Sequence, residues 1–155
     1  MRVAIAGGHG QIALLLTRLL ADRGDEVRSL IRNPDHTEDV RAAGGTPVVA
    51  DLEELDVASL AEVVAGVDAV VFAAGAGPGS GAPRKETVDY AGAVNLARAA
   101  AAVGIRRVVV ISSANADAAT PGDEVFSVYL RAKGRADDEI VFVFDVDAPV
   151  SNPWG

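Results

Sequence analysis

Apolar positions alternate along the chain between short continuous runs and runs with helical spacing. The first run, Arg2–Gly7, is rich in Val, Ile and Ala and ends in glycine, which is typical of a short buried strand. In Gly10–Gly24 the leucines recur every three or four residues, which predicts a helix. The same pattern continues down the chain. It predicts strands at Glu26–Arg32, Thr46–Ala50, Asp68–Ala74, Arg107–Ser112 and Ile140–Val146, and helices at Asp35–Ala43, Val57–Ala65, Glu86–Val103 and Phe126–Asp137.

Strands that alternate with helices at this spacing predict βαβ units and a parallel sheet. The strands are almost uninterrupted apolar runs, as expected when helices cover both faces of the sheet. We therefore expect an α/β fold, a doubly wound three-layer sandwich, formed by a single domain over residues 1–155. The Gly/Pro/Ser-rich segment Gly75–Pro83 is either a rim over a ligand cleft or an ordinary surface loop.

Composition removes several classes of function. The chain has 155 residues, no cysteine, only two histidines and a formal net charge of −8. The lack of cysteine excludes disulfides and thiol catalysis, and we expect no metal site. The negative charge argues against binding to nucleic acid or to anionic membranes. No apolar run reaches the length of a membrane span, so a cytoplasmic protein is expected.

The turn after the first predicted strand has the spacing of a dinucleotide-binding fingerprint. Gly7 permits a tight turn, and Gly10 lets the backbone approach a pyrophosphate. The small residue Ala13 allows the helix to pack closely on the sheet. The free N–H groups at the helix start, at Gln11 and Ile12, would face the anion. The strand–turn–helix context makes this pattern specific.

The end of the second predicted strand bears on the choice of cofactor. An NAD site usually has Asp or Glu there, to bind the ribose 2′-hydroxyl. This chain has Arg32 and Asn33 instead, and an arginine can hold a 2′-phosphate through charge-assisted hydrogen bonds. We therefore expect NADP(H) to be preferred over NAD(H). The alternative is that Arg32 is a solvated charge at the end of a strand.

Other candidate contacts follow the next strands. Asp51 and Leu52 come after the third strand, and Ala73, Ala74 and Gly75 end the fourth, where the adenine and the ribose of the cofactor would lie. Individually these residues are unspecific, because small residues in a buried strand usually serve packing.

A possible catalytic group follows the fifth predicted strand. Ser112 and Ser113 end that strand, and Tyr129 and Lys133 are four residues apart on the next helix, so they share one face. A nearby ammonium favours the phenolate, and such a tyrosine can exchange a proton with a substrate oxygen during hydride transfer. The lysine can also bind the nicotinamide ribose. A solvated helix face would show the same spacing.

These residues resemble the short-chain dehydrogenase/reductase superfamily, whose fold is Rossmann-like. The closest likeness is to its atypical branch of NmrA-like, NAD(P)H-binding proteins, sometimes labelled NAD-dependent epimerase/dehydratase. It extends over about residues 1–139. The segments that carry it are RVAIAGGHGQIALLLTRLLADRGDEVRSLIRNPDH, VVADLE, DAVVFAAGAG, VVVISSANAD and VYLRAKGRADDE.

The resemblance implies a role for each matching residue. Gly7 and Gly10 match the pyrophosphate turn, Arg32 the 2′-phosphate contact, and Asp51 with Leu52 the adenine contact. Ser113 resembles the serine that orients the substrate, Tyr129 the proton donor and Lys133 its partner. Strand alternation lets only one of Ser112 and Ser113 face the cleft, and we expect Ser113.

The C-terminal segment departs from the family pattern. Members continue through a strand that ends in an Arg-Pro-Gly-like segment, whereas this chain reads IVFVFDVDAPVSNPWG after Glu139. We expect Asp145 and Asp147 to be a polar pair at a strand end, and Trp154 to make a terminal contact. The substrate lobe is therefore expected to be short or absent.

Three functions remain open at this point. The first is an NADP(H)-dependent oxidoreductase that acts on a small carbonyl, quinone or flavin-like acceptor. The second is a non-catalytic NADP(H)-binding redox sensor or regulatory module. The third is a Rossmann-like domain that has lost its cofactor. The helices at Glu86–Val103 and around Tyr129 can pair in a homodimer, although close packing on the sheet equally explains their small residues.

Overall fold

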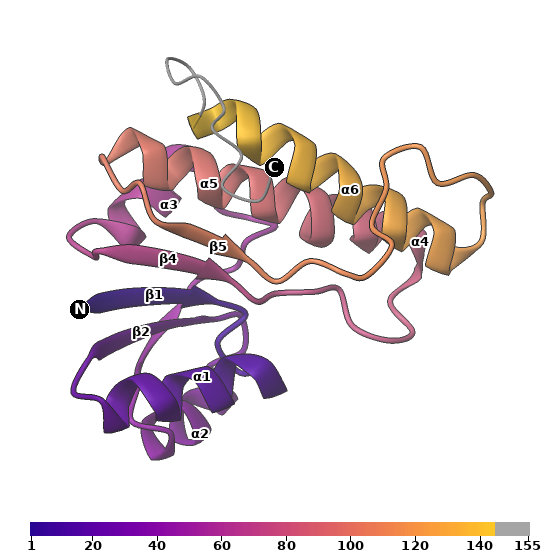
Figure 1. Cartoon of the computed structure of the whole chain (residues 1–155). Coiled ribbons are helices and arrows are strands. Elements are labelled where there is room, and N and C mark those ends of the chain that lie inside the picture. The colour runs from indigo at the N-terminus through magenta and orange to yellow at the C-terminus, as the bar shows by residue number, and fades with distance from the viewer. Residues whose placement is uncertain (145–155) are drawn as a thin grey trace.

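A five-stranded parallel sheet forms the centre of the molecule in a computed structural model, which describes residues 1–144 except for the side chain of Phe142. The strand order is β3-β2-β1-β4-β5 (Figure 1). The chain adds β2 and β3 on one side of β1 and then crosses over to add β4 and β5 on the other side. This arrangement confirms the doubly wound, Rossmann-like α/β fold. The strands are β1 (Arg2–Ala6), β2 (Glu26–Ile31), β3 (Thr46–Val49), β4 (Ala69–Phe72) and β5 (Val108–Val110).

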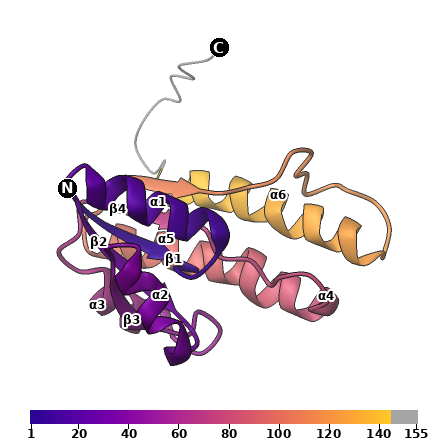
Figure 2. The same ribbon diagram turned by 90° about the horizontal axis from the view of Figure 1, so that it is seen from below.

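Helices cover both faces of the sheet. In Figure 1, α1 and α2 lie on one face, and α3, α5 and α6 lie on the other. Figure 2 shows α6 running beside the segment that leads from α4 into α5. None of the helices within residues 1–144 is long and apolar enough to span a membrane. The helices are α1 (Gln11–Asp22), the 3-10 turn η1 (Pro34–His36), α2 (Thr37–Ala42), α3 (Val57–Val64), α4 (Gly81–Arg84), the π-helix η2 (Lys85–Gly92), α5 (Ala93–Ala102) and α6 (Val125–Phe144).

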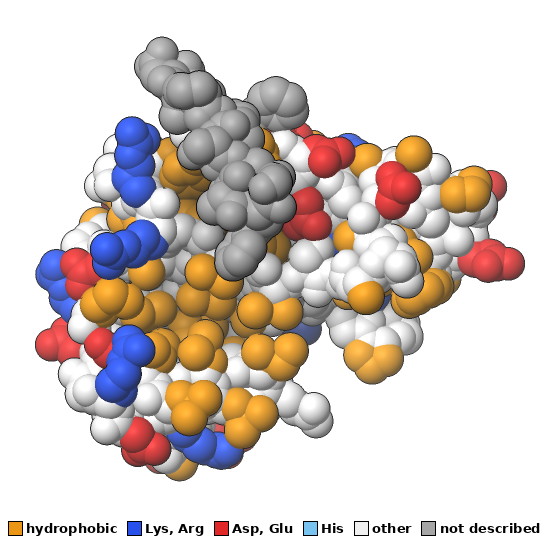
Figure 3. Space-filling view, viewed as in Figure 1, with side chains coloured by type: hydrophobic (Ala, Val, Ile, Leu, Met, Phe, Trp, Pro, Cys, Tyr) orange, Lys and Arg blue, Asp and Glu red, His pale blue; other side chains and the backbone are white. Residues whose placement is uncertain are grey.

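Strand β1 shows why the buried strands are apolar throughout. Val3 and Ile5 pack in the cluster beneath α1, whereas Ala4 and Ala6 pack in the cluster beneath α3 and α5. Successive side chains of a strand point to opposite faces, and here both faces are covered. The edge strand β5 is less protected, and Val109 remains 52% exposed. Figure 3 shows hydrophobic side chains gathered across α1 and the neighbouring sheet edge.

The predicted sixth strand at Ile140–Val146 is wrong over the part that the structure describes, because α6 continues without a break to Phe144. Asp137–Glu139 contains no turn-forming glycine or proline, so nothing stops the helix there. Ile140 and Phe144 lie one helical turn apart and both pack on the core, which outweighs the strand preference of the β-branched and aromatic run. Asp145, Asp147 and Trp154 lie outside the described residues.

The predicted helix Glu86–Val103 consists of two different helices. Its first half belongs to the π-helix η2, which begins at Lys85, and its second half is α5. Lys85, Val88, Asp89 and Gly92 of η2 are all buried. The segment before it is a loop only as far as Ser80, since α4 begins at Gly81. The wider turn of a π-helix is common at functional sites, and here it brings two charged side chains inside the molecule.

Candidate functional site

Two neighbouring pockets open at the carboxyl ends of the strands. The first has a volume of about 330 Å³ and lies where β1, β2 and β4 end. The second, of about 620 Å³, lies between the end of β5, η2 and α6. Residues 73–76, which follow β4, line both pockets. Doubly wound sheets bind ligands at this edge, where the strand order reverses. Because the two pockets share these residues, they adjoin each other along the edge.

The first pocket has a wall of backbone where β1 leads into α1. Gly7 has a φ of 76°, and a Cβ atom there would lie 2.5 Å from Ala74 Cα. A Cβ atom at Gly8 would lie 2.6 Å from the Cβ atom of Ser29. The Gly10 N–H donates to the Gly7 carbonyl at 2.9 Å and closes the turn. Side chains are therefore excluded at Gly7 and Gly8, and a ligand can approach the main chain closely there.

The start of α1 adds a favourable site for an anion. Its first N–H groups have no acceptor within the helix, and the helix dipole is positive at this end. No acidic residue lies in the first turn, and no side chain caps it. These features together fit the pyrophosphate of a dinucleotide.

Most of the residues predicted to bind a cofactor lie around these pockets. Those on the first pocket are Gly7, Gly10, Arg32, Asn33, Asp51, Leu52, Ala73, Ala74 and Gly75. Ile12, Ser112 and Lys133 instead line the second pocket, which Ala73, Ala74 and Gly75 also line. Gln11 is exposed and lines neither pocket.

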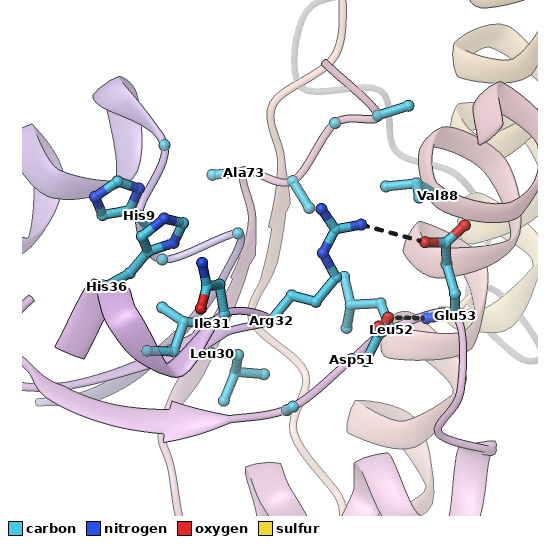
Figure 4. Close-up of a pocket in the computed structure, with 18 of the residues that line it drawn as sticks. His9, Leu30, Ile31, Arg32, His36, Asp51, Leu52, Glu53, Ala73 and Val88 are labelled. Atoms are coloured by element: carbon cyan, nitrogen blue, oxygen red, sulfur yellow. Dashed lines mark hydrogen bonds and ion pairs between the residues drawn. The ribbon is translucent and has the colours of Figure 1, made fainter. Parts of the chain in front are cut away.

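An ion-pair network crosses the first pocket. Arg32 reaches from the end of β2 towards Glu53, with 3.7 Å between the guanidinium nitrogen and the carboxylate oxygen (Figure 4). Glu53 also pairs with Arg84 at 2.9 Å and accepts a hydrogen bond from the Thr87 hydroxyl. The hydrogen bond from Arg84 is the main reason why the pKa of Glu53 is lowered. Arg32 remains 58% exposed, so its guanidinium can turn from Glu53 to a phosphate at low cost.

Two histidines lie at the rim of the first pocket. The rings of His9 and His36 are stacked, with 3.6 Å between their centroids (Figure 4). The Nε2 atom of His9 lies 2.7 Å from a carboxylate oxygen of Asp39 on α2. This contact joins the glycine turn to the segment after β2 and holds the rim in place.

The second pocket contains the predicted tyrosine–lysine pair. Tyr129 and Lys133 on α6 both line it, as their spacing predicted. The Tyr129 hydroxyl makes no hydrogen bond to any residue of the described part of the chain, whereas its ring packs near Phe126. The Lys85 ammonium lies 5.6 Å from the centroid of the Tyr129 ring.

Lys133 is almost completely buried at the base of this pocket. Its ammonium donates to the Ile111 carbonyl at 2.9 Å and lies 3.9 Å from a carboxylate oxygen of Asp89. Burial lowers the pKa of Lys133, and the nearby Asp89 charge opposes this effect. Burial also raises the pKa of Asp89, one oxygen of which accepts a hydrogen bond from the Ala76 N–H. The other oxygen has no hydrogen-bond partner among the described residues.

The expectation that Ser113 faces the cleft is wrong in the structure. Ser112 lines the second pocket, and its hydroxyl donates to Asp137 at 2.5 Å. The Ser113 hydroxyl donates to the Ala114 carbonyl instead. Strand β5 ends at Val110, two residues before the predicted end, so strand alternation no longer decides which serine faces the pocket.

Sequence reasoning missed four charged residues of the two pockets as site residues. They are Glu53 and Arg84 in the first pocket and Lys85 and Asp89 in the second. Lys85 and Asp89 have the same four-residue spacing as Tyr129 and Lys133, and this was the available signal. The signal was weak, because charged residues at this spacing usually lie on solvated helix faces.

The family is decided by a match over most of the chain. Residues 7–141 match a family described as NAD(P)H-binding. The chain belongs to this NAD(P)H-binding family. The match includes the glycine turn and extends through Tyr129 and Lys133 on α6.

Relatives of this family member agree with that assignment. The UPF0659 protein C216.03 of Schizosaccharomyces pombe is 32% identical over 97% of this chain and 69% of its own length. The uncharacterized sugar epimerase YhfK of Bacillus subtilis is 33% identical over 88% of this chain and 64% of its own length. A Bacillus halodurans structure, provisionally assigned as an NAD-dependent epimerase/dehydratase, is 37% identical with a TM-score of 0.81, covering 90% of this chain and 64% of that one. The chain thus spans about two thirds of the length of these relatives.

Proposed function

We propose that this protein is an NADP(H)-dependent oxidoreductase of the atypical short-chain dehydrogenase/reductase type that acts on a small molecule with a carbonyl group. The observation that carries the proposal is the wall shared by the two pockets. Residues 73–76 separate a glycine-built dinucleotide cradle from a pocket that contains Tyr129, Ser112 and Lys133. This arrangement supports binding of the dinucleotide across the sheet edge, with its reactive end beside Tyr129.

On the cofactor side, the backbone of the glycine turn would hold the pyrophosphate, and Asp51 and Leu52 would border the adenosine. Arg32 supports a preference for NADP(H), because its exposed guanidinium lies at the end of β2, where the 2′-phosphate is recognised in this type of fold. Asn33 lies beside it on the same pocket wall.

On the substrate side, each polar residue has a separate role. NADPH, when bound, supplies a hydride to the carbonyl carbon. Tyr129 donates its phenolic proton to the carbonyl oxygen, so the product is an alcohol, and the tyrosine regains a proton from solvent. Ser112 orients that oxygen, and Asp137 holds its hydroxyl in place. Lys133 is the proposed partner of Tyr129 in this pocket, and its buried ammonium would be available to the ribose of the cofactor.

A two-step experiment tests this proposal. The purified protein is titrated with NADPH and with NADH, reading nicotinamide fluorescence and thermal shift together. We expect micromolar binding of NADPH and clearly weaker binding of NADH. A panel of carbonyl and quinone acceptors is then assayed for NADPH oxidation. Tight binding without turnover on any acceptor would favour the redox sensor instead, and absence of binding to either nucleotide would overturn the proposal.

A further inference from the structure

Lys85 is a buried cation in the second pocket with no assigned task in the proposed reaction. It is the first residue of the π-helix η2, and only 8% of the residue is exposed to solvent. Its ammonium donates one hydrogen bond, to the Gly77 carbonyl at 3.1 Å, and lies 5.6 Å from the centre of the Tyr129 ring. An ammonium has three N–H donors, so two remain available beside the proposed proton donor.

The distribution of charge in this pocket calls for an anion. Lys85 and Lys133 bring two ammonium groups, whereas Asp89 is the single acidic residue among the described residues of the lining. Asp89 pairs with Lys133, and Lys85 makes no ion pair with any carboxylate of the described residues. Much of the remaining lining is apolar, and a buried charge in such surroundings is costly unless it is paired. A ligand with a negative charge would supply the ion pair that Lys85 lacks among the described residues.

The form of this site favours a carboxylate over a phosphate. Lys85 is a single point charge, and no arginine lines the second pocket. Phosphate recognition typically uses several donors, often with a bidentate guanidinium, whereas one ammonium suits a monoanion. Ile12, Pro78 and Phe126 offer apolar contacts for the rest of such a molecule.

We propose that Lys85 binds a carboxylate of the substrate and that the substrates are small oxo acids with an apolar body. The carbonyl to be reduced would lie at Tyr129, with the carboxylate a short distance away at Lys85. This inference rests on the proposed function for the identity of the reacting group. Lys85 itself determines specificity and takes no part in proton transfer.

The experiment uses a pair of probes that differ only in charge. Phenylacetate and the neutral phenylacetamide have nearly the same shape, and neither is reduced when the protein is saturated with NADP⁺. Isothermal titration of the full chain should show that phenylacetate binds at least about tenfold more tightly, as expected for a charge-assisted hydrogen bond. Lys85→Gln should abolish this preference while it keeps a donor for the Gly77 carbonyl. Lys85→Arg should retain most of it.

Two further variants complete the design. Arg131→Met removes a cation from α6 whose guanidinium donates to the Thr120 and Gly122 carbonyls outside the pocket, and it should leave the preference unchanged. Tyr129→Phe should also keep the preference, although we expect it to lose turnover. Thermal unfolding of each variant checks that it is folded.

The outcomes separate this inference from the proposed function. If the wild type binds both probes equally, binds neither, or keeps its preference in a folded Lys85→Gln variant, Lys85 is not a carboxylate site. If the preference follows Lys85 but the wild type oxidises NADPH with no oxo acid or other acceptor, the carboxylate site stands and the oxidoreductase proposal fails.

Discussion

The two pockets lie on the same sheet edge, but main chain is prominent in the lining of the first and side chains in that of the second. The first is bordered by main chain, since the turn after β1 has no room for a side chain at Gly7 or Gly8 and the start of α1 offers N–H groups. The second is shaped by side chains that three distant segments bring together, with Ser112 after β5, Lys85 and Asp89 on η2, and Tyr129 and Lys133 on α6. A backbone site serves a constant ligand such as a dinucleotide, whereas a side-chain site can be adapted to different substrates.

The largest effect is expected at the side-chain pocket. Tyr129→Phe removes the proposed proton donor and should lower kcat by about 10²–10⁴-fold, the usual contribution of general acid catalysis. NADPH binding should change little, because the first pocket would hold most of the cofactor and phenylalanine keeps the aromatic ring of Tyr129. Turnover is measured from NADPH absorbance with the best acceptor. Tyr90→Phe is the matched control, since that hydroxyl bonds Glu139 away from both pockets. Equal rates for the two variants would rule out Tyr129 as the donor.

At the backbone pocket, a single methyl group should be costly. Gly7→Ala combines a positive φ with a Cβ atom 2.5 Å from Ala74 Cα, so the free energy of unfolding should fall by about 2–4 kcal/mol. Gly24→Ala has a similar φ of 88° but nothing within 4 Å, and it should cost only about 1 kcal/mol. Urea denaturation measures both. Equal losses would show that the turn has room for a side chain.

The helix α6 and the loop after β5 approach each other closely at Gly134. A Cβ atom there would lie 2.3 Å from the Ala118 nitrogen, so α6 or the loop after β5 must shift in Gly134→Ala. We expect a loss of about 1–3 kcal/mol in the free energy of unfolding, measured by urea denaturation. Gly92→Ala, also at a buried helical glycine, would meet only atoms at 3.6 Å or more and should be neutral or slightly stabilising. A neutral Gly134→Ala variant would contradict this packing.

In the first pocket, where main chain is prominent, Arg32 is a side chain that we expect to select between NADP(H) and NAD(H). Arg32→Ala should weaken NADPH binding about ten- to a hundredfold and leave NADH binding nearly unchanged. Fluorescence titration measures both affinities. Arg41→Ala removes an exposed arginine that pairs with Glu38 outside the pockets, and it serves as the control. If Arg32→Ala weakens both nucleotides equally, Arg32 does not recognise the 2′-phosphate.

The smallest effect concerns the ion pairs of Glu53. Its pKa is lowered, chiefly by the hydrogen bond from Arg84, so the stability it contributes is present above its ordinary pKa of 4.5 and is lost as the pH falls. Glu53→Gln should therefore lower the free energy of unfolding by less than about 1 kcal/mol at pH 7, because solvent screens these ion pairs. Near pH 2 it should not change the free energy of unfolding, because Glu53 is then protonated. Thermal unfolding across this pH range measures the difference. Glu54→Gln, at an exposed neighbour, should show no such pH dependence.

The same contrast explains which parts of the fold and of the site were predictable. The first strand, glycine turn and helix are contiguous in sequence, and their signals are local. The path of the chain after Tyr129 was predicted less well. Ile140–Phe144 has the composition of a strand but forms helix because Ile140 and Phe144 pack on the core. The choice between Ser112 and Ser113 failed for a related reason, since it depended on where β5 ends.

The sequence by itself determined the layered α/β architecture, the dinucleotide turn and the family, because periodicity and glycine spacing act over neighbouring residues. Only the tertiary structure decided that Lys85 and Asp89 are buried beside Tyr129 and Lys133. Burial of a charged side chain depends on which segments pack over it, and here they are η2, α6 and the loop after β4. The π-helical turn of η2 aims both charges inward, and no pattern within that segment distinguishes it from an ordinary solvated helix face.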